Sequence, residues 1–379
     1  MKVLIAGGGT GGHIYPGITI GKALLEKGAE VLFAGTRRGL EKEIVPREGF
    51  PIEFISADSF PRRLSWRLVR SAFTAAKGVG EAVALVRKFA PDACVGTGGY
   101  AAGPVVLAAA LLGVPTVIQE QNAHPGVTNR ILAYVADKVA LGYEAAAAGF
   151  RQRDKLVVTG NPIRPEICEI TRAEGAKRLG LDPGRKRVLI TGASQGARSI
   201  NRAVCEAFPK LQRLDAEFLV AAGRGGFDAL LDALPVPRAE GRPVLGEGRA
   251  YGNVLIVPYL YDMPAALAAS DLVVGRAGAI SIAEVTARGL PAVLIPYPFA
   301  AENHQEKNAR VLERAGAARV ILDRDLNGEA LYRTVSELLG DEAALRSMAQ
   351  ASRSLGKPGA VWEIVALIEA AVAARGRAR

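Results

Sequence analysis

The chain has 379 residues, of which 49% are hydrophobic and 23% charged, and this composition excludes a disordered chain. Because this length exceeds what one core usually holds, we expect two domains. Lysine and arginine outnumber acidic residues by 48 − 38 = 10, which favours anionic partners; aromatic residues are only 6% and form no RNA-stacking pattern with arginines, so nucleic acid is the least favoured partner.

The three cysteines, Cys94, Cys168 and Cys205, are far apart and include no C-x-x-C pair. We therefore expect no disulfide framework and no cysteine zinc site, which fits a reducing cytoplasm, and we expect all three side chains to be buried. Only a strand's length of apolar residues precedes the first glycines, so a signal peptide is not expected.

A glycine-rich segment, GGGTGGH, follows the first predicted strand and ends in His13. Residues 3–6 are typical of a buried parallel strand, and residues 17–25 have the pattern of a helix. Glycines tolerate positive φ and close approach, and a helix start presents unpaired N–H groups to an anion. The segment therefore predicts a phosphate-binding turn, with a tight turn of purely structural role as the alternative.

The same glycines, Gly7, Gly9 and Gly12, have the G-x-G-x-x-G spacing of dinucleotide-binding proteins. Those proteins need an acidic residue near the end of the second strand to bind the ribose diol. The predicted second strand, residues 30–38, ends in two arginines and has no carboxylate at its exit. An NAD-dependent dehydrogenase is therefore a disfavoured alternative.

A basic segment covers residues 59–73 and contains no acid. On a helix, Trp66, Val69 and Phe73 would share one face. Arginines beside an exposed apolar face suit an anionic bilayer; alternatively, this face packs into the core of the first domain. The candidate membrane residues are Arg62, Arg63, Trp66, Arg67, Val69, Arg70 and Phe73.

No charge occurs between Asp92 and Glu120, a length that could span a membrane. Prolines and a glycine interrupt this stretch. We interpret it as a buried βαβ unit, with a strand, a helix and a strand at residues 93–96, 105–112 and 116–119.

Strand and helix signals alternate to about Thr159, and GNPIRP then indicates a linker because it combines two prolines with a glycine. The pattern restarts with a strand, a small-residue loop and a helix at residues 187–190, 191–197 and 199–208. Further strands are expected at 217–221, 254–257, 272–274 and 292–295. Alternating units of this kind form parallel sheets that bind ligands beyond the carboxyl ends of the strands.

We therefore predict an α/β protein with two Rossmann-like, doubly wound parallel-sheet domains facing each other across a cleft. The expected boundaries are 1–160 for the N-terminal domain, 161–166 for a linker, 167–355 for the C-terminal domain and 356–379 for a last helix that packs back on the N-terminal domain.

The strongest local signal is the sequence from Asp271 to Glu284, in which a strand ends in a glycine-rich loop and a helix begins near Ala279. A carboxylate in the early turns of that helix can accept hydrogen bonds from a ribose diol while N–H groups face a diphosphate. The alternative is a solvated glutamate stabilised by the helix dipole. Residues 296–309 follow with many amides and acids, which suit a hydroxyl-rich ligand or ordinary capping.

These segments together resemble one family. The motifs AGGGTGGH, GTGGYAAGP, EQN, GNPIR, SQGA, RAGAISIAE and NHQEKNA, in this order and over nearly the whole chain, resemble the MurG family of bacterial UDP-N-acetylglucosamine:lipid I N-acetylglucosaminyltransferases. That family has the GT-B fold. The resemblance implies an N-terminal domain on the acceptor and membrane side and a C-terminal domain that binds UDP-GlcNAc.

The resemblance also implies the substrate-binding residues. Three residues of the glycine-rich segment would line the donor side of the cleft and the acceptor diphosphate region, namely Thr10, Gly11 and Gly12. The nucleotide sugar would contact Asn122, Arg164 and Ser194. Uridine would be held by Leu260, Ala279, Ile280, Ser281, Ile282, Ala283 and Glu284, with Glu284 on the ribose. The GlcNAc hydroxyls would be reached by His304 and Gln305.

The implied reaction is inverting transfer of GlcNAc to the C4 hydroxyl of MurNAc in lipid I, which forms lipid II in peptidoglycan synthesis. His13 is the candidate general base, because imidazole titrates near working pH, and Glu120 is in reserve; alternatively, His13 only orients the loop or the acceptor phosphate. No Asp-x-Asp metal motif is evident near the donor loops. We therefore expect no metal and no cofactor, with helix N-termini, loop amides and Arg164 stabilising the leaving UDP.

Two further alternatives stay open. One is another GT-B nucleotide-sugar transferase that acts on a glycolipid such as diacylglycerol, and the other is a non-catalytic nucleotide-sugar-binding protein. The expected partners are UDP-GlcNAc, lipid I and an anionic inner-leaflet surface, without nucleic acid. The expected location is the cytoplasmic face of the bacterial cell membrane, held peripherally and without a transmembrane helix.

Overall fold

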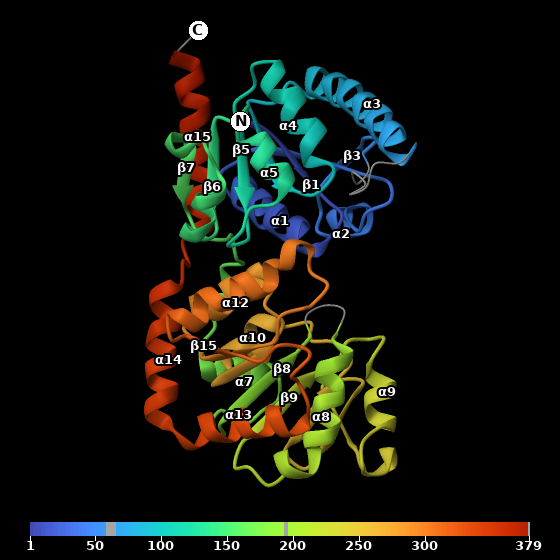
Figure 1. Ribbon diagram of the computed structural model, residues 1–379, viewed down its shortest axis with the longest axis vertical. Helices are drawn as coiled ribbons and strands as arrows, with labels where there is room; N and C mark the ends of the chain where they lie inside the picture. The colour runs from blue at the N-terminus through green and yellow to red at the C-terminus, as the bar shows by residue number, and fades with distance from the viewer. Residues whose placement is uncertain (58–65, 193–195, 378–379) are drawn as a thin grey trace. The chain divides into compact units, whose positions relative to one another are not determined.

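A computed structural model describes residues 1–57, 66–192 and 196–377; of residues 66–73, 75 and 377 it describes only the backbone (Figure 1). The chain divides into two compact units. The first contains Met1–Ile163 together with Gly359–Arg379, and the second contains Arg164–Pro358.

The described part of the first unit contains a seven-stranded parallel sheet in the order β3-β2-β1-β4-β5-β6-β7. Its apolar, β-branched strands are buried on both faces, as expected for a parallel sheet covered by helices. The strands are β1 Lys2–Gly7, β2 Glu30–Gly35, β3 Ile52–Phe54, β4 Ala93–Gly98, β5 Thr116–Glu120, β6 Lys138–Leu141 and β7 Leu156–Val158.

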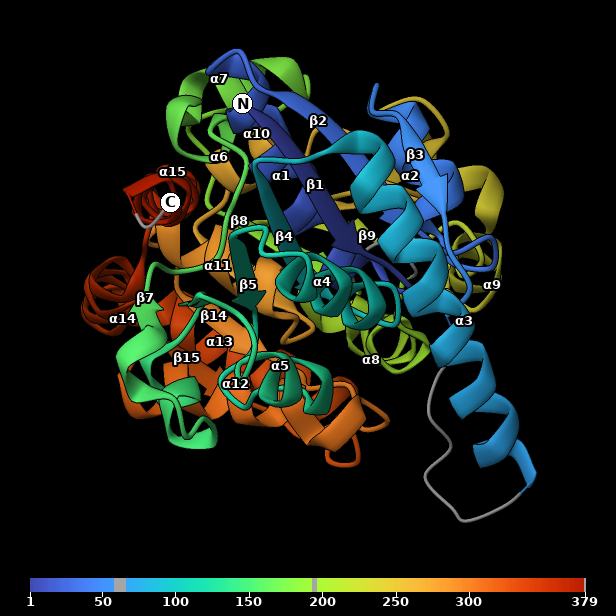
Figure 2. The same cartoon turned by 90° about the horizontal axis from the view of Figure 1, so that it is seen from above.

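Helices cover both faces of this sheet. They are α1 Gly11–Glu26, α2 Glu41–Arg47, α3 Trp66–Phe89, α4 Ala102–Leu111, α5 Val127–Leu132 and α15 Ala360–Arg377, with short 3₁₀ turns at Glu144–Gly149 and Arg153–Lys155. Val3 and Ile5 of β1 pack with α1 and α15, whereas Leu4 and Ala6 pack with α3 and α4. Figure 2 shows α3 and α4 lying side by side.

The described part of the second unit contains an eight-stranded sheet in the order β10-β11-β12-β9-β8-β13-β14-β15. The pairs β10–β11 and β11–β12 are antiparallel and the others are parallel. The strands are β8 Arg187–Thr191, β9 Glu217–Ala221, β10 Arg242–Val244, β11 Gly248–Tyr251, β12 Val254–Val257, β13 Leu272–Gly275, β14 Ala292–Leu294 and β15 Ala318–Val320.

Helices α8, α9 and α13 share one hydrophobic core with this sheet, and α8 lies against α13 (Figure 1). Helices α6 and α7 pack against α10, and α11 packs against α14. The helices are α6 Glu166–Glu169, α7 Arg172–Arg178, α8 Arg198–Leu211, α9 Phe227–Asp232, α10 Met263–Ala268, α11 Ala279–Arg288, α12 His304–Arg314, α13 Gly328–Gly340 and α14 Glu342–Leu355, with 3₁₀ turns at Arg238–Glu240 and Ala301–Asn303.

The prediction of two α/β units with parallel sheets is confirmed, and residues 93–119 form the βαβ unit β4–α4–β5. Two expectations were wrong. The first helix begins at Gly11 and not at Gly17, because Gly12 and Pro16 weigh against a helix in the sequence pattern yet lie inside α1. Of the three cysteines expected to be buried, Cys94 is buried, Cys205 is partly buried and Cys168 is exposed, because α6 directs Ile167 and not Cys168 into the core.

Within the described residues, none of the helices combines the length and the apolar character needed to cross a bilayer.

Candidate functional site

The carboxyl ends of β1 and β4 form the switch point of the first sheet, where the strand order reverses and ligands bind in this class of fold. The loops after these two strands touch. A Cβ at Gly99, whose φ is +79°, would lie 2.1 Å from the Gly8 carbonyl oxygen, and one at Gly98 would lie 2.7 Å from Nδ1 of His13. The paired glycines of GTGGY are therefore needed to fit the glycine-rich loop and the imidazole against β4.

His13 lies in the first turn of α1, half-buried, with its Nδ1 toward the protein. Nδ1 is 3.1 Å from the Thr97 carbonyl oxygen and 3.3 Å from Oε1 of Gln121. Both groups can only accept a hydrogen bond, so Nδ1 carries the proton and Nε2 carries the lone pair of the neutral ring. The Thr97 hydroxyl also donates to the His13 carbonyl at 2.8 Å, which fixes the backbone of this turn.

Glu41 is a site residue that the sequence analysis missed. Its side chain is fully buried, and it accepts hydrogen bonds from the Gly9 N–H, the Thr36 N–H and the Thr36 hydroxyl, each at 2.8 Å. The first turn of α2 thus brings a carboxylate to the end of β2, where the sequence offered none. Both oxygens bind protein donors, so Glu41 holds the glycine-rich loop and is not presented to a ribose.

Glu120, the reserve base, is 1% exposed and fully committed to hydrogen bonds. One oxygen accepts from the backbone N–H and side-chain amide of Asn122, and the other from the Gly126 N–H and the Asn129 amide. These contacts shape the loop after β5 and fix the position of Asn122. Because protein donors occupy both oxygens and the side chain is buried, Glu120 is not presented to an acceptor hydroxyl, so the geometry favours His13 as the base.

In the second unit, Arg164 and Glu284 are brought together. Arg164 lies in the predicted linker segment and is the first residue of the second unit, Glu284 lies on α11, and their Nη2 and Oε1 atoms are 3.1 Å apart. The Glu284 carboxylate is nearly buried, and burial raises its pKa above the usual range, while the charge and hydrogen bond of Arg164 act in the opposite direction. The structure thus pairs two residues to which the resemblance assigns donor contacts.

Arg276, in the loop between β13 and α11, is another residue whose role the sequence analysis missed. Its guanidinium donates to the carbonyls of Ile295 and Pro296, to the Ser199 hydroxyl and to Asp323. These bonds join the loop before α11 to the segment after β14 and to the start of α8. Its place in RAGAISIAE was the available signal, but its partners are distant in the sequence.

The remaining donor candidates lie on these same loops and helices. Gln305 accepts a hydrogen bond from the Tyr297 N–H at 2.9 Å, and Nδ1 of His304 contacts the Ala301 carbonyl oxygen at 2.7 Å, so both side chains hold the turn before α12. Buried Leu260 follows β12. The first turns of α11 contain Ala279, Ile280, Ser281, Ile282 and Ala283.

Thr10 is at the N-cap position of α1 without a capping hydrogen bond from its side chain, and Gly11 and Gly12 are the first residues of the helix, where the N–H groups have no partner within the helix. Ser194, Arg62 and Arg63 lie outside the described residues. Of the other membrane candidates, Trp66, Arg67, Val69, Arg70 and Phe73 are at the start of α3, and their side chains also lie outside the description. Among the described residues, no three His, Cys, Asp or Glu side chains form a metal-binding group.

Comparison with known proteins defines the class first. The glycosyltransferase family 28 N-terminal domain matches residues 3–141, and the glycosyltransferase family 28 C-terminal domain matches residues 187–364.

Individual relatives narrow the class. Two are the UDP-N-acetylglucosamine–N-acetylmuramyl-(pentapeptide) pyrophosphoryl-undecaprenol N-acetylglucosamine transferases of Moorella thermoacetica, 48% identical over 97% of this chain and 98% of the relative, and of Desulfitobacterium hafniense, 47% identical over 96% and 98%. The crystal structure of Acinetobacter baumannii MurG is similar with a TM-score of 0.75 and 27% identity, covering 97% of this chain and 99% of that one. The chain belongs to the MurG family of glycosyltransferases.

Proposed function

We propose that this protein transfers N-acetylglucosamine from UDP-GlcNAc to the C4 hydroxyl of the MurNAc residue of lipid I, with inversion, to give lipid II and UDP. The observation that carries the proposal is the 48% identity to a transferase of that name over 97% of the chain. The geometry supports it, since each unit presents polar groups at the carboxyl ends of a parallel sheet.

His13 acts as the general base in this proposal. Its Nδ1–H donates toward the protein, so Nε2 takes the proton of the C4 hydroxyl as the hydroxyl oxygen bonds to the anomeric carbon. The bond from that carbon to the UDP oxygen breaks, and its electron pair leaves with UDP. Thr97 and Gln121 accept from the resulting imidazolium and so stabilise its charge.

The second unit holds the donor. Glu284 accepts hydrogen bonds from the ribose diol, and the N–H groups at the start of α11 face the diphosphate together with Arg164. Ser194, Leu260 and residues 279–283 complete the nucleotide contacts, and His304 and Gln305 bind the sugar. Asn122, held by Glu120, is assigned to the nucleotide sugar, and Thr10, Gly11 and Gly12 are assigned to the acceptor diphosphate.

The decisive experiment incubates the purified protein with UDP-GlcNAc and a lipid I analogue and measures disaccharide product and free UDP. We expect both products in equal amounts, and we expect chelators to leave the rate unchanged. Product formed only with diacylglycerol would favour the glycolipid transferase, and binding of UDP-GlcNAc without turnover would favour a binding protein.

His13→Ala tests the assigned base. We expect kcat to fall by roughly 10²-fold or more, because general base catalysis contributes about that factor, with the KM for UDP-GlcNAc nearly unchanged. His124→Ala is the matched control on the neighbouring β5–α5 loop and should retain most of kcat. A His13→Ala variant with altered KM alone would indicate that His13 only orients the loop or the acceptor.

We also propose that the basic start of α3 and the residues before it bind an anionic bilayer at the cytoplasmic face, where the lipid acceptor is found. The support is the sequence pattern of Arg62, Arg63, Arg67 and Arg70, since each arginine near such a surface contributes on the order of 1 kcal/mol. Cosedimentation with phosphatidylglycerol vesicles tests it. Trp66→Ser with Arg67→Glu should abolish binding, and unchanged binding would reject the proposal.

A further inference from the structure

Next to His13 lies a network of three buried amide side chains that come from two segments of the sequence. Gln119 is the fourth residue of β5, Gln121 follows that strand, and Asn161 comes from the GNPIR segment. Their exposed fractions are 0%, 2% and 3%. Because a buried amide must satisfy both its oxygen and its nitrogen, the way each of these side chains faces is set by its neighbours.

Backbone carbonyls fix how the amides of this network are oriented. The Gln121 amide group contacts the Thr97 carbonyl at 2.7 Å and the Gln119 carbonyl at 3.4 Å, so the contacting atom is the nitrogen, which donates. The same nitrogen donates to Oε1 of Gln119. Gln119 therefore turns its own nitrogen to Oδ1 of Asn161 at 2.9 Å, and Asn161 donates back to the Gln121 carbonyl at 2.9 Å.

Neighbouring glycines leave the space that this arrangement needs. A Cβ at Gly142 would lie 2.4 Å from Oδ1 of Asn161, and one at Gly98 would lie 2.7 Å from Nδ1 of His13. A larger residue at Gly142 would displace the Asn161 side chain, and one at Gly98 would displace the His13 ring. The backbone at these two glycines therefore limits where Asn161 and His13 can lie.

The consequence for His13 follows from the last oxygen in the network. Because the nitrogen of Gln121 faces three acceptor oxygens and shares its two N–H groups among them, Gln121 must present Oε1 to Nδ1 of His13, 3.3 Å away. The Thr97 carbonyl is the second acceptor on the same nitrogen, at 3.1 Å. A flipped Gln121 would place its oxygen against two carbonyl oxygens and the Gln119 amide oxygen, which electrostatics disfavours.

We propose that Gln121 is a positioning residue: held by Gln119 and Asn161, it keeps the neutral His13 ring in the Nδ1–H tautomer, with the lone pair on Nε2. The inference rests on the proposed function, in which Nε2 of His13 accepts the proton of the acceptor hydroxyl. Gln121 does not touch the reacting atoms; it orients the group that does and stabilises the imidazolium by accepting from it.

Nitrogen NMR tests the tautomer directly and needs no substrate. The chain has three histidines, so long-range ¹H–¹⁵N spectra of histidine-labelled protein contain three rings, and the His13 ring is assigned by its loss in His13→Asn. At a pH at which the His13 ring is neutral, we expect Nδ1 to have the ¹⁵N chemical shift of a protonated nitrogen and Nε2 that of an unprotonated one. An Nε2–H tautomer in the wild-type chain would overturn the proposal.

Gln121→Met keeps the size of the side chain and removes its acceptor. We expect the Nδ1–H share of His13 to fall, because one of the two acceptors that face Nδ1 is then removed. We expect kcat to drop about tenfold with an unchanged KM for UDP-GlcNAc, the fold-change typical of losing one hydrogen bond to a charged group. Gln212→Met, whose amide contacts only the Tyr251 carbonyl of the second unit among its described partners, is the matched control and should change neither value.

The two measurements separate this inference from the function it deepens. A Gln121→Met variant that is folded, with the wild-type His13 spectrum and wild-type kcat, would overturn the role of Gln121. If the wild-type protein had no transferase activity and its His13 still showed the Nδ1–H tautomer, the proposed function would be contradicted. The orientation of His13 by Gln121 would still be supported.

Discussion

Glu41 shows how one residue can hold a functional loop from a distance in the sequence. Its carboxylate is buried between Gly8, Gly35 and Gly39, where a Cβ at any of these positions would lie within 2.6 Å of a Glu41 side-chain atom. It accepts from Gly9, in the loop that leads into α1 and His13. An amide in its place would point its NH₂ group at one of the donors.

We therefore predict that Glu41→Gln lowers the free energy of unfolding of the first unit by about 1–3 kcal/mol, since one buried donor is left unpaired. It should also lower kcat, because the glycine-rich loop is loosened. Urea denaturation and steady-state kinetics measure the two effects. Glu43→Gln, an exposed change two residues away on α2, should leave both unchanged, and equal behaviour of the two variants would contradict the role of Glu41.

Glu284 links pH to donor binding. Burial raises the pKa of its carboxylate, so at acidic pH just above the usual range for glutamate the folded state holds more protons than the unfolded state. The free energy of unfolding should therefore fall as pH rises through that window. Only the ionised form accepts both hydrogen bonds of a ribose diol, so UDP-GlcNAc should bind more tightly as pH rises through the same window.

Calorimetric titration with UDP-GlcNAc across the acidic range measures this dependence. Arg164→Met should move it to higher pH, because Arg164 lowers the pKa of Glu284, and Glu284→Gln should weaken binding and remove this part of the dependence. Glu337→Gln, on the exposed surface of α13, serves as the control. If the affinity of Glu284→Gln for UDP-GlcNAc still changed with pH in the same way, a group other than Glu284 would be responsible.

At the scale of single residues, the sequence named candidate site residues but not the contacts among them. His13 and Glu284 are candidates because their residue types suit the chemistry, and Arg164 is a candidate because of the family resemblance. The partners of Glu41 lie 5 and 32 positions away, and Gln121 lies 108 positions from His13. Nothing in a local pattern predicts which side chains meet across such separations.

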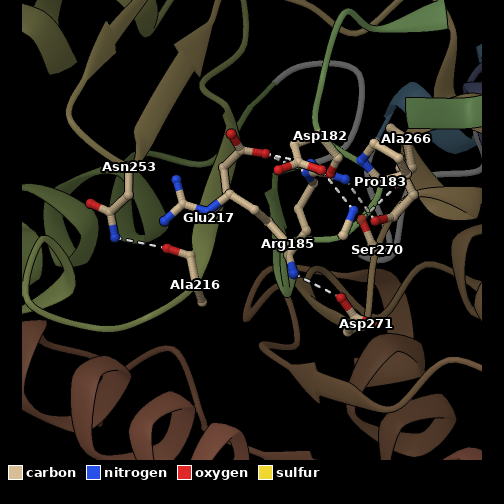
Figure 3. A network of polar contacts seen from close by, with 12 residues as sticks. Asp182, Pro183, Arg185, Ala216, Glu217, Asn253, Ala266, Ser270 and Asp271 are labelled. Atoms are coloured by element: carbon tan, nitrogen blue, oxygen red, sulfur yellow. Dashed lines mark hydrogen bonds and ion pairs between the residues drawn. The ribbon is translucent and has the colours of Figure 1, made fainter. Parts of the chain in front are cut away.

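At the scale of elements, polar contacts at the amino ends of β8, β9 and β13 hold the second sheet together, at the edge opposite the proposed donor site (Figure 3). Arg187 is fully buried and donates to Glu217, to the Ala269 carbonyl and to the Asp182 carbonyl. Asp271 accepts from the Arg187 N–H and from Arg172. Three strands and two loops are thereby joined.

Removing one partner of this network leaves a buried charge without compensation. Arg187→Met should lower the free energy of unfolding of the second unit by about 3–5 kcal/mol, and adding Glu217→Leu should recover much of that loss. Arg319→Met breaks an exposed pair with Glu337 and should cost less than about 1 kcal/mol. Thermal unfolding measures all three; a double variant as unstable as Arg187→Met would contradict the argument from charge burial.

The elements that the sequence predicted best are the central strands. β1, β4, β5, β8 and β9 are apolar because helices bury both of their faces. Edge strands such as β3 and β10 are three residues long, partly exposed and contain polar residues or proline, so their pattern does not differ from that of a loop. Glycines and a proline likewise concealed the first turns of α1.

At the scale of the whole molecule, the chain builds its first unit from both ends. Helix α15 buries Val361, Ile364, Val365 and Ile368 against α1 and the strands of the first sheet, and Lys27 of the first unit pairs with Glu369. The second unit, Arg164–Pro358, is continuous and has its own core. Removal of α15 from the carboxyl end of the sequence therefore removes part of the first unit and leaves the second unit complete.

A chain that ends at Pro358 should lose the first unit selectively. Without α15, an apolar face of the first sheet is exposed to water. Because each large aliphatic side chain lost from a core costs about 2–5 kcal/mol, the first unit should not stay folded. We expect scanning calorimetry to show one transition, that of the second unit, with retained binding of UDP and no transferase activity. Trp362→Ala in the full chain, a change at an exposed position of the same helix, should keep both transitions. If the truncated chain kept the transition of the first unit, α15 would be an accessory to that unit, and the core it shares with β1 would contribute little to folding.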